Sequence, residues 1–422
     1  MIGFSNSFLF GTATSAHQIE GNNVNSDWYH FEEIGKLPFK SGLACNHWNK
    51  MEEDTNLMKE LGYNAYRFSI EWARIFPSDD KVDQKAIGKY KMLENLLLEN
   101  DIEPFVTLYH FTLPKWFSDL GGFEKEENLK YWRKYVEIIP EILENTKNIM
   151  TINEPVVYVV TSYLLGDWPP FKRNVKAAFN VARGLLEAHA YAYDYLKDHG
   201  YSVGIVKNVP RFVPGSDKTR DKKARDKIDL LFNWAFLNAL FSGKLEFLGK
   251  KADVTPSNAD FIGLNYYNIF KVWHSWNPLT LYFRYEDAGV SKRTQMGWSV
   301  YPRGIYESLK DLHNRYSKPL YVSENGIATL DDEWRKEYIV RHLQYVHKAL
   351  KEGIDVRGYF YWSLMDNFEW DKGFRPRFGL IEINYETFER IPRGSAYLYG
   401  EIAKNKVITG DILEKYGIKE IS

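Results

Sequence analysis

The sequence predicts a closed eight-stranded (β/α) barrel, and three observations lead to this fold class. Eight short runs rich in β-branched and aromatic residues alternate with amphipathic stretches of helical length, which predicts a parallel sheet. Eight is also the number of strands that closes such a barrel. The 422 residues suffice for one large barrel with long loops, and no linker rich in Pro, Gly or Ser divides them. We therefore expect a single domain over residues 1–422. A doubly wound open sheet is the structural alternative, because a strand count does not show closure.

The eight predicted strands are distributed along the whole chain. In order they are FLFGTATSA (8–16), AYRFSIEW (65–72), EPFVTLYH (103–110), NIMTINEP (148–155), SVGIVKNV (202–209), FIGLNYYNIF (261–270), PLYVSENG (319–326) and VRGYFYWSLMDN (356–367). The fourth strand is expected to stop near its end, since Pro155 lacks the backbone N–H that a sheet requires. The seventh stops at Asn325-Gly326, a common turn pair.

Amphipathic helices are expected between the strands. The patterns are found at 51–64, 84–101 and 331–353, and the last is the clearest because its apolar residues recur at three- and four-residue spacing. Asp331 and Asp332 suit its N-terminus, and Gly353 suits its end. The length in excess of a minimal barrel belongs to long loops, chiefly 17–50, 109–130 and 271–301. The charged run 217–227 is expected to be a solvated helix face.

Composition and charge exclude several classes of protein. The 55 basic and 56 acidic residues are closely mixed, which gives no basic field for nucleic acid and no polybasic membrane patch. The N-terminus lacks the basic and apolar segments of a signal peptide, and no stretch has the length of a transmembrane helix, so we expect a cytoplasmic protein. The high aromatic content, 16%, fits either core packing or a cleft lined with flat rings, which sugar faces favour.

Neither a metal centre nor a disulfide framework is expected. Cys45 is the sole cysteine, and we interpret it as a small buried residue. His17, His30 and His47 lack metal-ligand spacing, and no His-Glu-x-x-His pattern occurs, so structural roles are expected for them.

Polar residues gather where the predicted strands end. In a (β/α) barrel the carboxyl ends of the strands meet at one rim, which carries the active site. The residues at this rim would be Gln18, Arg67, Glu71, His110, Asn153, Glu154, Asn265, Tyr267, Glu324 and Asp366.

Glu154 and Glu324 form the most informative pair among them. Each has a structural interpretation, because TINEP (151–155) and SENG (323–326) both read as strand-to-turn junctions. At the ends of the fourth and seventh strands, however, the two carboxyl groups would face each other across the barrel mouth. Two facing carboxyl groups are what cleavage of a glycosidic bond requires, one as an acid and one ionised. Arg67 would keep one of them ionised, which favours Glu324 as nucleophile and Glu154 as acid, although spacing alone does not assign the roles.

Taken together, these motifs resemble glycoside hydrolase family 1, the β-glucosidase and β-galactosidase group. The likeness rests on FLFGTATSAHQIEG (8–21), YRFSIEW, TINEP, GLNYY, SENG, WSLMDNFEW and RFGLIEINYETFER (377–390), which occur in this order over nearly the whole chain. The resemblance implies a (β/α) barrel, no metal or organic cofactor, and hydrolysis with retention of anomeric configuration. The substrate would be a small carbohydrate, a terminal β-glucoside and also a β-galactoside.

The resemblance also implies a role for each residue of the site. Glu154 would be the acid/base and Glu324 the nucleophile, with Arg67 and Tyr267 holding the charge and orientation of Glu324. Asn153 would bind the sugar 2-hydroxyl and Asn265 would support the site. The outer hydroxyls of the terminal sugar would be bound by Gln18, His110, Glu369 and Trp370. Aromatic surfaces for the two halves of the substrate would come from Trp362, Phe378 and Trp298.

Three departures from the family pattern concern the substrate rather than the chemistry. Phe111 follows His110 where the family usually has Trp, so one outer hydroxyl contact is in question. Val156 follows TINEP where many members carry an aromatic residue, and GDWPPFKRN (166–174) replaces the usual Ala-Pro-Gly turn. The aromatic segment 272–285 fits a core element, a hydrophobic leaving-group site or a membrane-associating surface, in that order. Val156 and WHSWNPLTLYF (273–283) together suggest an apolar acceptor site.

Other functions are weighed against a retaining β-glycosidase. A non-hydrolytic sugar-binding barrel would lack one carboxylate, and a barrel isomerase or aldolase would need a phosphate loop or a strand-end Lys that we do not find. Within the family, β-mannosidases and 6-phospho-β-glycosidases are alternatives. The latter replace the Glu369-Trp370 pair with phosphate-binding Ser and Lys residues, and a carboxylate at 369 would repel phosphate. Glucose and galactose are not distinguished, because Gln18 and Glu369 suit either. No nucleic-acid partner is expected, membrane association is open but not expected, and no feature indicates an oligomeric state.

Overall fold

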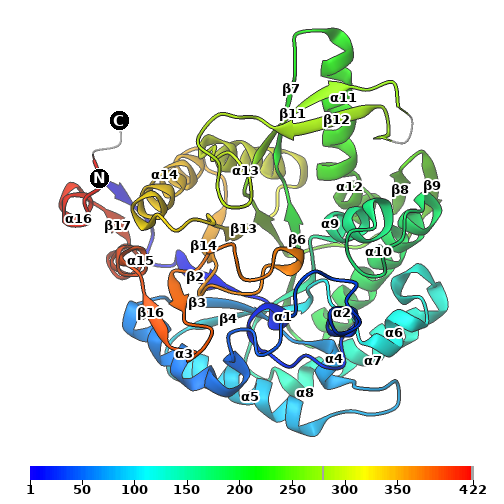
Figure 1. Ribbon diagram of the computed structural model, residues 1–422, viewed down its shortest axis with the longest axis horizontal. Helices are drawn as coiled ribbons and strands as arrows, with labels where there is room; N and C mark the ends of the chain where they lie inside the picture. Colours follow the sequence, from blue (N-terminus) through cyan, green and yellow to red (C-terminus); the bar gives the residue numbers. More distant parts are fainter. Residues whose placement is uncertain (278–279, 420–422) are drawn as a thin grey trace.

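The structure is a computed structural model that describes residues 1–277 and 280–419, and it contains a closed parallel barrel (Figure 1). The barrel strands are β2 (Leu9–Ala13), β3 (Ala65–Ser69), β4 (Glu103–Tyr109), β5 (Asn148–Asn153), β6 (Ser202–Asn208), β10 (Phe261–Asn265), β13 (Leu320–Asn325) and β14 (Val356–Trp362). They pair in the order β10-β13-β14-β2-β3-β4-β5-β6, and β10 pairs with β6 to complete the ring. The predicted fold class is therefore confirmed, and the open sheet is excluded.

Each predicted strand contains one barrel strand, but one prediction was too long. The run 261–270 was predicted as a single strand, whereas β10 ends at Asn265 and a separate strand, β11 (Ile269–His274), follows. β11 leaves the barrel and lies between β7 (Arg211–Pro214) and β12 (Phe283–Asp287) in a three-stranded sheet, which stands beside the barrel in Figure 1. Both segments are apolar and β-prone, so propensity alone did not reveal the break between them.

The barrel interior below the rim is filled by side chains, many of them aromatic. The ring of Phe105 lies 4.9 Å from the rings of Tyr321 and Phe360, measured between centroids. Space for these rings comes from glycine on the inner face, since a Cβ at Gly11 would lie 2.5 Å from the Phe360 ring. The interior is thus a packed floor, and a ligand has access only above it.

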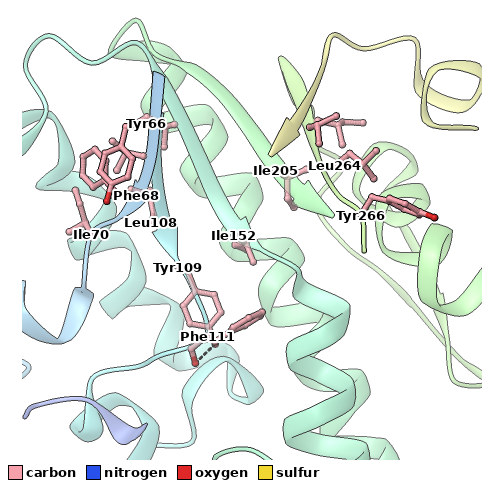
Figure 2. Close-up of a cluster of buried hydrophobic side chains, with 14 of the residues drawn as sticks. Tyr66, Phe68, Ile70, Leu108, Tyr109, Phe111, Ile152, Ile205, Leu264 and Tyr266 are labelled. Carbon is pink, nitrogen blue, oxygen red and sulfur yellow. Dashed lines mark hydrogen bonds between the residues drawn. The ribbon is translucent and has the colours of Figure 1, made fainter. Parts of the chain in front are cut away.

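The outer face of the strands packs against the helices (Figure 2). On β3, Tyr66 and Phe68 point to this outer layer, so strand alternation turns Arg67 between them toward the barrel axis. The buried residues drawn in Figure 2 include Leu108, Tyr109, Ile152, Ile205 and Leu264, which hold the neighbouring strands in the same way.

The helices that surround the barrel include all three predicted ones. Among the helices around the barrel are α3 (His47–Leu61), α5 (Gln84–Glu99), α7 (Leu129–Glu137), α10 (Val175–Asp198), α13 (Arg303–Tyr316), α14 (Asp332–Lys351) and α15 (Gly394–Asn405). α3 begins four residues before its predicted start. The predicted ends of α14 are confirmed, because Asp331 accepts a hydrogen bond from the Trp334 N–H and Gly353 follows with a left-handed φ of 82°.

The three predicted loops carry structure of their own. Segment 17–50 contains α2 (Asp27–Glu33), segment 109–130 contains α6 (Lys115–Asp119), and segment 271–301 contains β12 and part of β11. Segment 217–227 forms most of α11 (Thr219–Asp229), whose charged residues are largely exposed, as predicted, although Asp221 is buried. Cys45 is buried, also as predicted. Within the described residues, no helix combines the length and the apolar character needed to cross a membrane.

Candidate active site

The residues predicted to form the site meet at the carboxyl end of the barrel. Here lies a cavity of about 1150 Å³. Its wall includes Gln18, His110, Asn153, Glu154, Tyr267, Trp298, Glu324, Trp362, Glu369, Trp370 and Phe378. The other two predicted residues, Arg67 and Asn265, are fully buried behind this wall and bond to the carboxyl groups. The geometry therefore brings all thirteen residues together.

Glu324 lies near the end of β13 and is paired with a cation. Arg67 Nη1 donates to Oε1 of Glu324 over 2.6 Å, and the Tyr267 hydroxyl donates to Oε2 over 2.7 Å. Burial raises the pKa of the Glu324 carboxyl, while the Arg67 cation and these two hydrogen bonds oppose the rise. The partners of Glu324 are therefore those that stabilise a carboxylate anion.

Glu154 follows β5 and has a different set of partners. Its backbone is left-handed, with φ 45° and ψ 58°, and Pro155 begins α9 (Pro155–Val159), so the strand ends at Asn153. Its Oε1 accepts hydrogen bonds from the side-chain amides of Asn265, at 2.8 Å, and Asn208, at 2.9 Å. Burial and the nearby Glu324 raise the pKa of Glu154 to about 7. At neutral pH this carboxyl group can both give and take a proton.

A network of buried side chains fixes the two carboxyl groups relative to each other. Arg67 Nη2 donates to Asn153 Oδ1 over 2.6 Å, and Asn265 Nδ2 lies 3.3 Å from the same oxygen. Asn153 Nδ2 in turn donates to His110 Nε2 over 3.2 Å. Burial and the Arg67 cation lower the pKa of His110 well below its usual range, so its ring is neutral and accepts this bond. These bonds connect side chains from β3, β5 and β10 with His110, which follows β4, so the barrel strands set the relative positions of the two carboxyl groups.

Gln18 and Glu369 form the polar end of the cavity. Gln18 Nε2 donates to Glu369 Oε2 over 3.2 Å, and also to the Phe368 carbonyl and the Asn367 amide oxygen. Burial, together with Glu324 and Asp371, raises the pKa of Glu369 to about 8. A carboxyl group that is neutral near pH 7 both donates and accepts hydrogen bonds, which suits sugar hydroxyls.

Aromatic rings flank this polar end. The His110 ring is nearly parallel to those of Trp362 and Trp370, with centroids 6.0 and 6.2 Å away. On the other side of the site Tyr267 lies 5.6 Å from Trp298, measured between ring centroids. Flat apolar faces beside hydroxyl-binding groups match the two kinds of surface that a pyranose presents.

Two residues at the site were not predicted. Asn208 bonds Glu154, and it ends β6, so the strand-end signal used for the other residues would have found it. Trp168 belongs to segment 166–174, which differs from the family pattern. Its ring centroid lies 5.2 Å from that of Phe111, and its Nε1 donates to Asp371 over 3.1 Å. No local signal distinguishes Trp168, because the long-range packing of two loops places it there.

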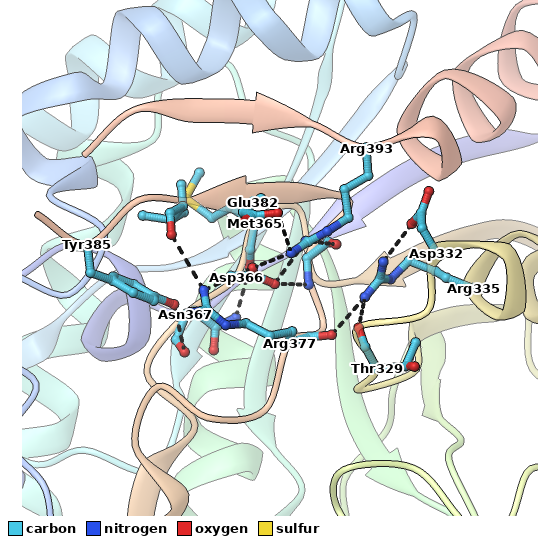
Figure 3. Close-up of polar contacts among 12 residues, drawn as sticks. Thr329, Asp332, Arg335, Met365, Asp366, Asn367, Arg377, Glu382, Tyr385 and Arg393 are labelled. Carbon is cyan, nitrogen blue, oxygen red and sulfur yellow. Dashed lines mark hydrogen bonds and ion pairs between the residues drawn. The ribbon is translucent and has the colours of Figure 1, made fainter. Parts of the chain in front are cut away.

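Two strand-end acids from the sequence have structural partners instead. Asp366 forms ion pairs with Arg377, at 3.2 Å, and Arg393, at 2.7 Å (Figure 3). Glu71 accepts bonds from the Thr112 hydroxyl and the Ala73 N–H, and so caps a short helix. Neither lines the cavity.

The histidines that lacked metal-ligand spacing also have structural partners where they are buried. His17 bonds Glu32 at 2.9 Å, and His47 bonds Asp54 at 2.7 Å. Among the residues that the structure describes, no cluster of three or more His, Cys, Asp or Glu is placed to hold a metal ion.

The cavity continues from the carboxyl groups into an apolar chamber. The chamber lies between α9, two π-helical segments (Val160–Leu165 and Leu230–Trp234) and the sheet β7-β11-β12. Its apolar lining includes Val156, Val157, Val160, Leu164, Phe212, Leu231, Phe232, Phe247, Phe270, Leu281 and Phe283. Of the segment 273–283, Leu281 and Phe283 thus face the chamber, Trp276 is 80% exposed, and Pro278 and Leu279 lie outside the described residues.

Comparison with known proteins is consistent with this geometry. The model of the family described as Glycosyl hydrolase family 1 matches residues 2–408. β-Glucosidase A of Thermotoga maritima is 35% identical over 95% of this chain and 98% of its own length. A 6-phospho-β-galactosidase of Staphylococcus haemolyticus is 31% identical, with 95% and 98% covered. The solved structure of a β-glycosidase from Pyrococcus horikoshii is 57% identical, covers 99% of both chains and superposes with a TM-score of 0.97.

Proposed function

The chain belongs to glycosyl hydrolase family 1 and is a retaining β-glycosidase of the β-glucosidase type, and on this premise we propose that Glu154 is its acid/base and Glu324 its nucleophile. One observation carries the assignment: the buried cation Arg67 bonds Glu324, whereas Glu154 Oε1 is bonded by the neutral amides of Asn265 and Asn208. A paired cation favours the anion that attacks, and neutral partners favour a group that exchanges a proton.

In the first step Glu154 gives its proton to the glycosidic oxygen as the bond from that oxygen to the anomeric carbon breaks. Glu324 forms a bond to the same carbon, which produces a covalent glycosyl-enzyme and a free alcohol. Tyr267 and Arg67 hold the two oxygens of Glu324, so the attacking carboxylate is fixed in orientation before substrate binds.

In the second step Glu154, now ionised, removes a proton from water, whose oxygen attacks the anomeric carbon and releases Glu324. Esterification of Glu324 has by then removed the negative charge that helped to raise the pKa of Glu154. The pKa of Glu154 therefore falls when the group must act as a base. Two displacements at one carbon give net retention.

The terminal sugar is proposed to be an unphosphorylated glucoside or galactoside. Gln18 and Glu369 present hydrogen-bonding groups to the outer hydroxyls of the sugar. Both side chains can bind the hydroxyl at which glucose and galactose differ, so they suit either epimer. Lys372 lies in the same wall but is paired with Asp371. A phosphate dianion would thus meet a Glu369 carboxyl group that is neutral near pH 7 and a Lys372 cation that is already paired, so neither supplies the positive charge that the dianion needs. This disfavours the 6-phospho substrate that the name of one relative specifies.

The leaving group is proposed to occupy the apolar chamber. Val156, the first chamber residue after Glu154 and Pro155, begins an apolar surface that runs from the acid/base to Phe283. Such a surface binds aryl and alkyl groups through burial and offers few polar partners to a second sugar. Alkyl and aryl β-glycosides should therefore be better substrates than cellobiose.

A panel of nitrophenyl glycosides tests the sugar preference directly. We expect turnover of the β-glucoside and β-galactoside, with weaker turnover of the β-mannoside and β-fucoside. A β-mannoside as best substrate would replace this proposal with β-mannosidase activity, the alternative within the family.

A further inference from the structure

Lys207 is a buried lysine beside the acid/base for which the proposed reaction has no use. It lies one residue before the end of β6, so the expectation that no strand end carries a lysine was wrong, and it is 1% exposed and does not line the cavity. The preceding residues on the same face, Val203 and Ile205, are apolar and fully buried, so position 207 continues an apolar surface. A lysine there incurs a desolvation cost that an apolar side chain of similar size would avoid.

The ammonium group of Lys207 has few partners. Its Nζ donates to the backbone carbonyl of Asn208 over 2.6 Å and lies 4.8 Å from the centroid of the Phe232 ring. In the described part of the chain it forms no ion pair with a carboxylate. Of the three protons that an ammonium can donate, one is thus used, and a ring face covers the group on another side.

The residues on either side of Lys207 both hold Glu154. The side-chain amide of Asn208 donates to Glu154 Oε1 over 2.9 Å, and the backbone carbonyl of Val206 accepts the N–H of Glu154 over 3.0 Å. Through the Asn208 carbonyl, Lys207 is also bonded to the residue that bonds the reacting carboxyl group. Lys207 therefore belongs to the support of Glu154 without lining the cavity.

The charged groups around this pair define its titration. The negative charges of Glu154, which follows β5, and of Asp229, at the end of α11, raise the pKa of Lys207. Asp229 itself accepts hydrogen bonds from the side chains of Asn233 and Trp234. Glu324 on β13, which forms an ion pair with Arg67, raises the pKa of Glu154. Burial lowers the pKa of Lys207 to about 7, the value to which Glu154 is raised, so both groups change charge over one pH range.

We propose that Lys207 is a positioning residue for catalysis, which adjusts the proton affinity of Glu154 from behind strand β6. This inference rests on the proposed role of Glu154 as acid/base. When Lys207 is cationic it stabilises the ionised Glu154 that the second step needs. When Lys207 is neutral it leaves Glu154 protonated, as the first step needs. An apolar residue at 207 would supply the packing without this coupling.

Two substitutions with opposite expected effects test the proposal. In Lys207→Met the cation is lost, so the alkaline limb of kcat/KM on an alkyl glucoside should move to higher pH by about 0.5 to 1 unit. In Lys207→Arg the charge persists at every accessible pH, so the limb should move to lower pH. The alkyl glucoside is used because its poor leaving group requires the acid.

Lys406→Met is the matched control. Lys406 also donates to a carbonyl, that of Phe8 at 2.7 Å, and lies 4.9 Å from the centroid of the Phe10 ring, beside the start of β2 and far from the rim. Its loss should lower Tm but leave the alkaline limb in place.

A folded Lys207→Met enzyme whose limb is unmoved, or moved to lower pH, overturns the proposal. If Lys207→Met does not fold, Lys207→Arg decides, and a limb at unchanged or higher pH then overturns it. Glu154→Gln keeps a failure of the proposed function distinguishable. If the alkaline limb persists in Glu154→Gln, the limb never belonged to Glu154, and the acid/base assignment fails together with the role of Lys207 that rests on it. If the limb is lost in Glu154→Gln but unmoved in Lys207→Met, only the role of Lys207 fails.

Discussion

Arg67 and Glu324 form a buried ion pair at the barrel rim, in which Nη1 donates to Oε1 over 2.6 Å. The pair comes from β3 and β13, which lie three strands apart in the barrel order. Loss of either partner would leave a buried charge uncompensated, which costs several kcal/mol. The pair therefore fixes an ionised carboxylate at the barrel mouth, and Glu154 across from it is the group that is free to exchange a proton.

The stereochemistry of the product follows from the two carboxyl groups. In retaining enzymes they lie about 5 to 5.5 Å apart, which leaves no room for an attacking water opposite the leaving group. We expect the first-formed sugar to be the β-anomer, observed in an early proton NMR time course. Appearance of the α-anomer before mutarotation would exclude Glu324 as nucleophile.

Phosphorylated sugars should be poor substrates because Glu369 and the Asp371–Lys372 ion pair in the cavity wall offer a phosphate dianion no net positive charge. Nitrophenyl β-glucoside should be turned over, whereas its 6-phosphate should give little or no product at equal concentration. Comparable kcat/KM on the two compounds would overturn the substrate class while leaving the two-carboxyl mechanism intact.

Leaving groups with longer apolar chains should be favoured by the chamber. From butyl to octyl β-glucoside, kcat/KM should increase, by up to ~0.8 kcal/mol for each methylene that is fully buried. Leu164→Gln places a polar group in the chamber and should flatten this increase. Leu330→Gln, at a residue that is 76% exposed and outside the cavity, is the control and should not. A flat response in the unmodified enzyme would remove the leaving-group assignment.

The pH profile should report the raised pKa of Glu154. As the acid, Glu154 must be protonated in the free enzyme, so kcat/KM on alkyl glucosides should be retained below pH 7 and fall above it. The decline should approach tenfold for each pH unit, because one proton is lost. If kcat/KM stays constant up to pH 9, Glu154 is either not the acid or has a pKa well above 7.

Much of this site could be predicted from the sequence because its signals are local. Glu154, Glu324 and Asn265 each stand at the end of a recognisable strand, and closure of eight strands brings such ends together. The same signal failed for Asp366, since the two arginines that neutralise it follow 11 and 27 residues later in irregular segments. Trp168 and the support that Lys207 gives depend on how loops pack and on the register of β5 with β6, which no local pattern encodes.

The central claim is that Glu154 transfers a proton rather than caps a turn, and Glu154→Gln tests it most directly. The amide keeps the shape and hydrogen bonding of the side chain but has no transferable proton. Alkyl glucosides should lose much of the 10²- to 10⁴-fold that general acid catalysis contributes, while activated aryl glucosides should still form the glycosyl-enzyme. Because its hydrolysis also needs Glu154, aryl substrates should show a burst followed by slow turnover.

Glu71→Gln is the matched control, since Glu71 is a buried strand-end carboxyl that caps a helix outside the cavity. It should lower Tm and reduce activity on every substrate by one common factor. The deciding measurement is the rate and product of the Glu154→Gln variant with an aryl β-glucoside and added azide, a nucleophile that needs no base. The account predicts restored turnover and a β-glycosyl azide. A uniform loss of activity, without burst or azide rescue, would contradict it and leave Glu154 as a structural cap.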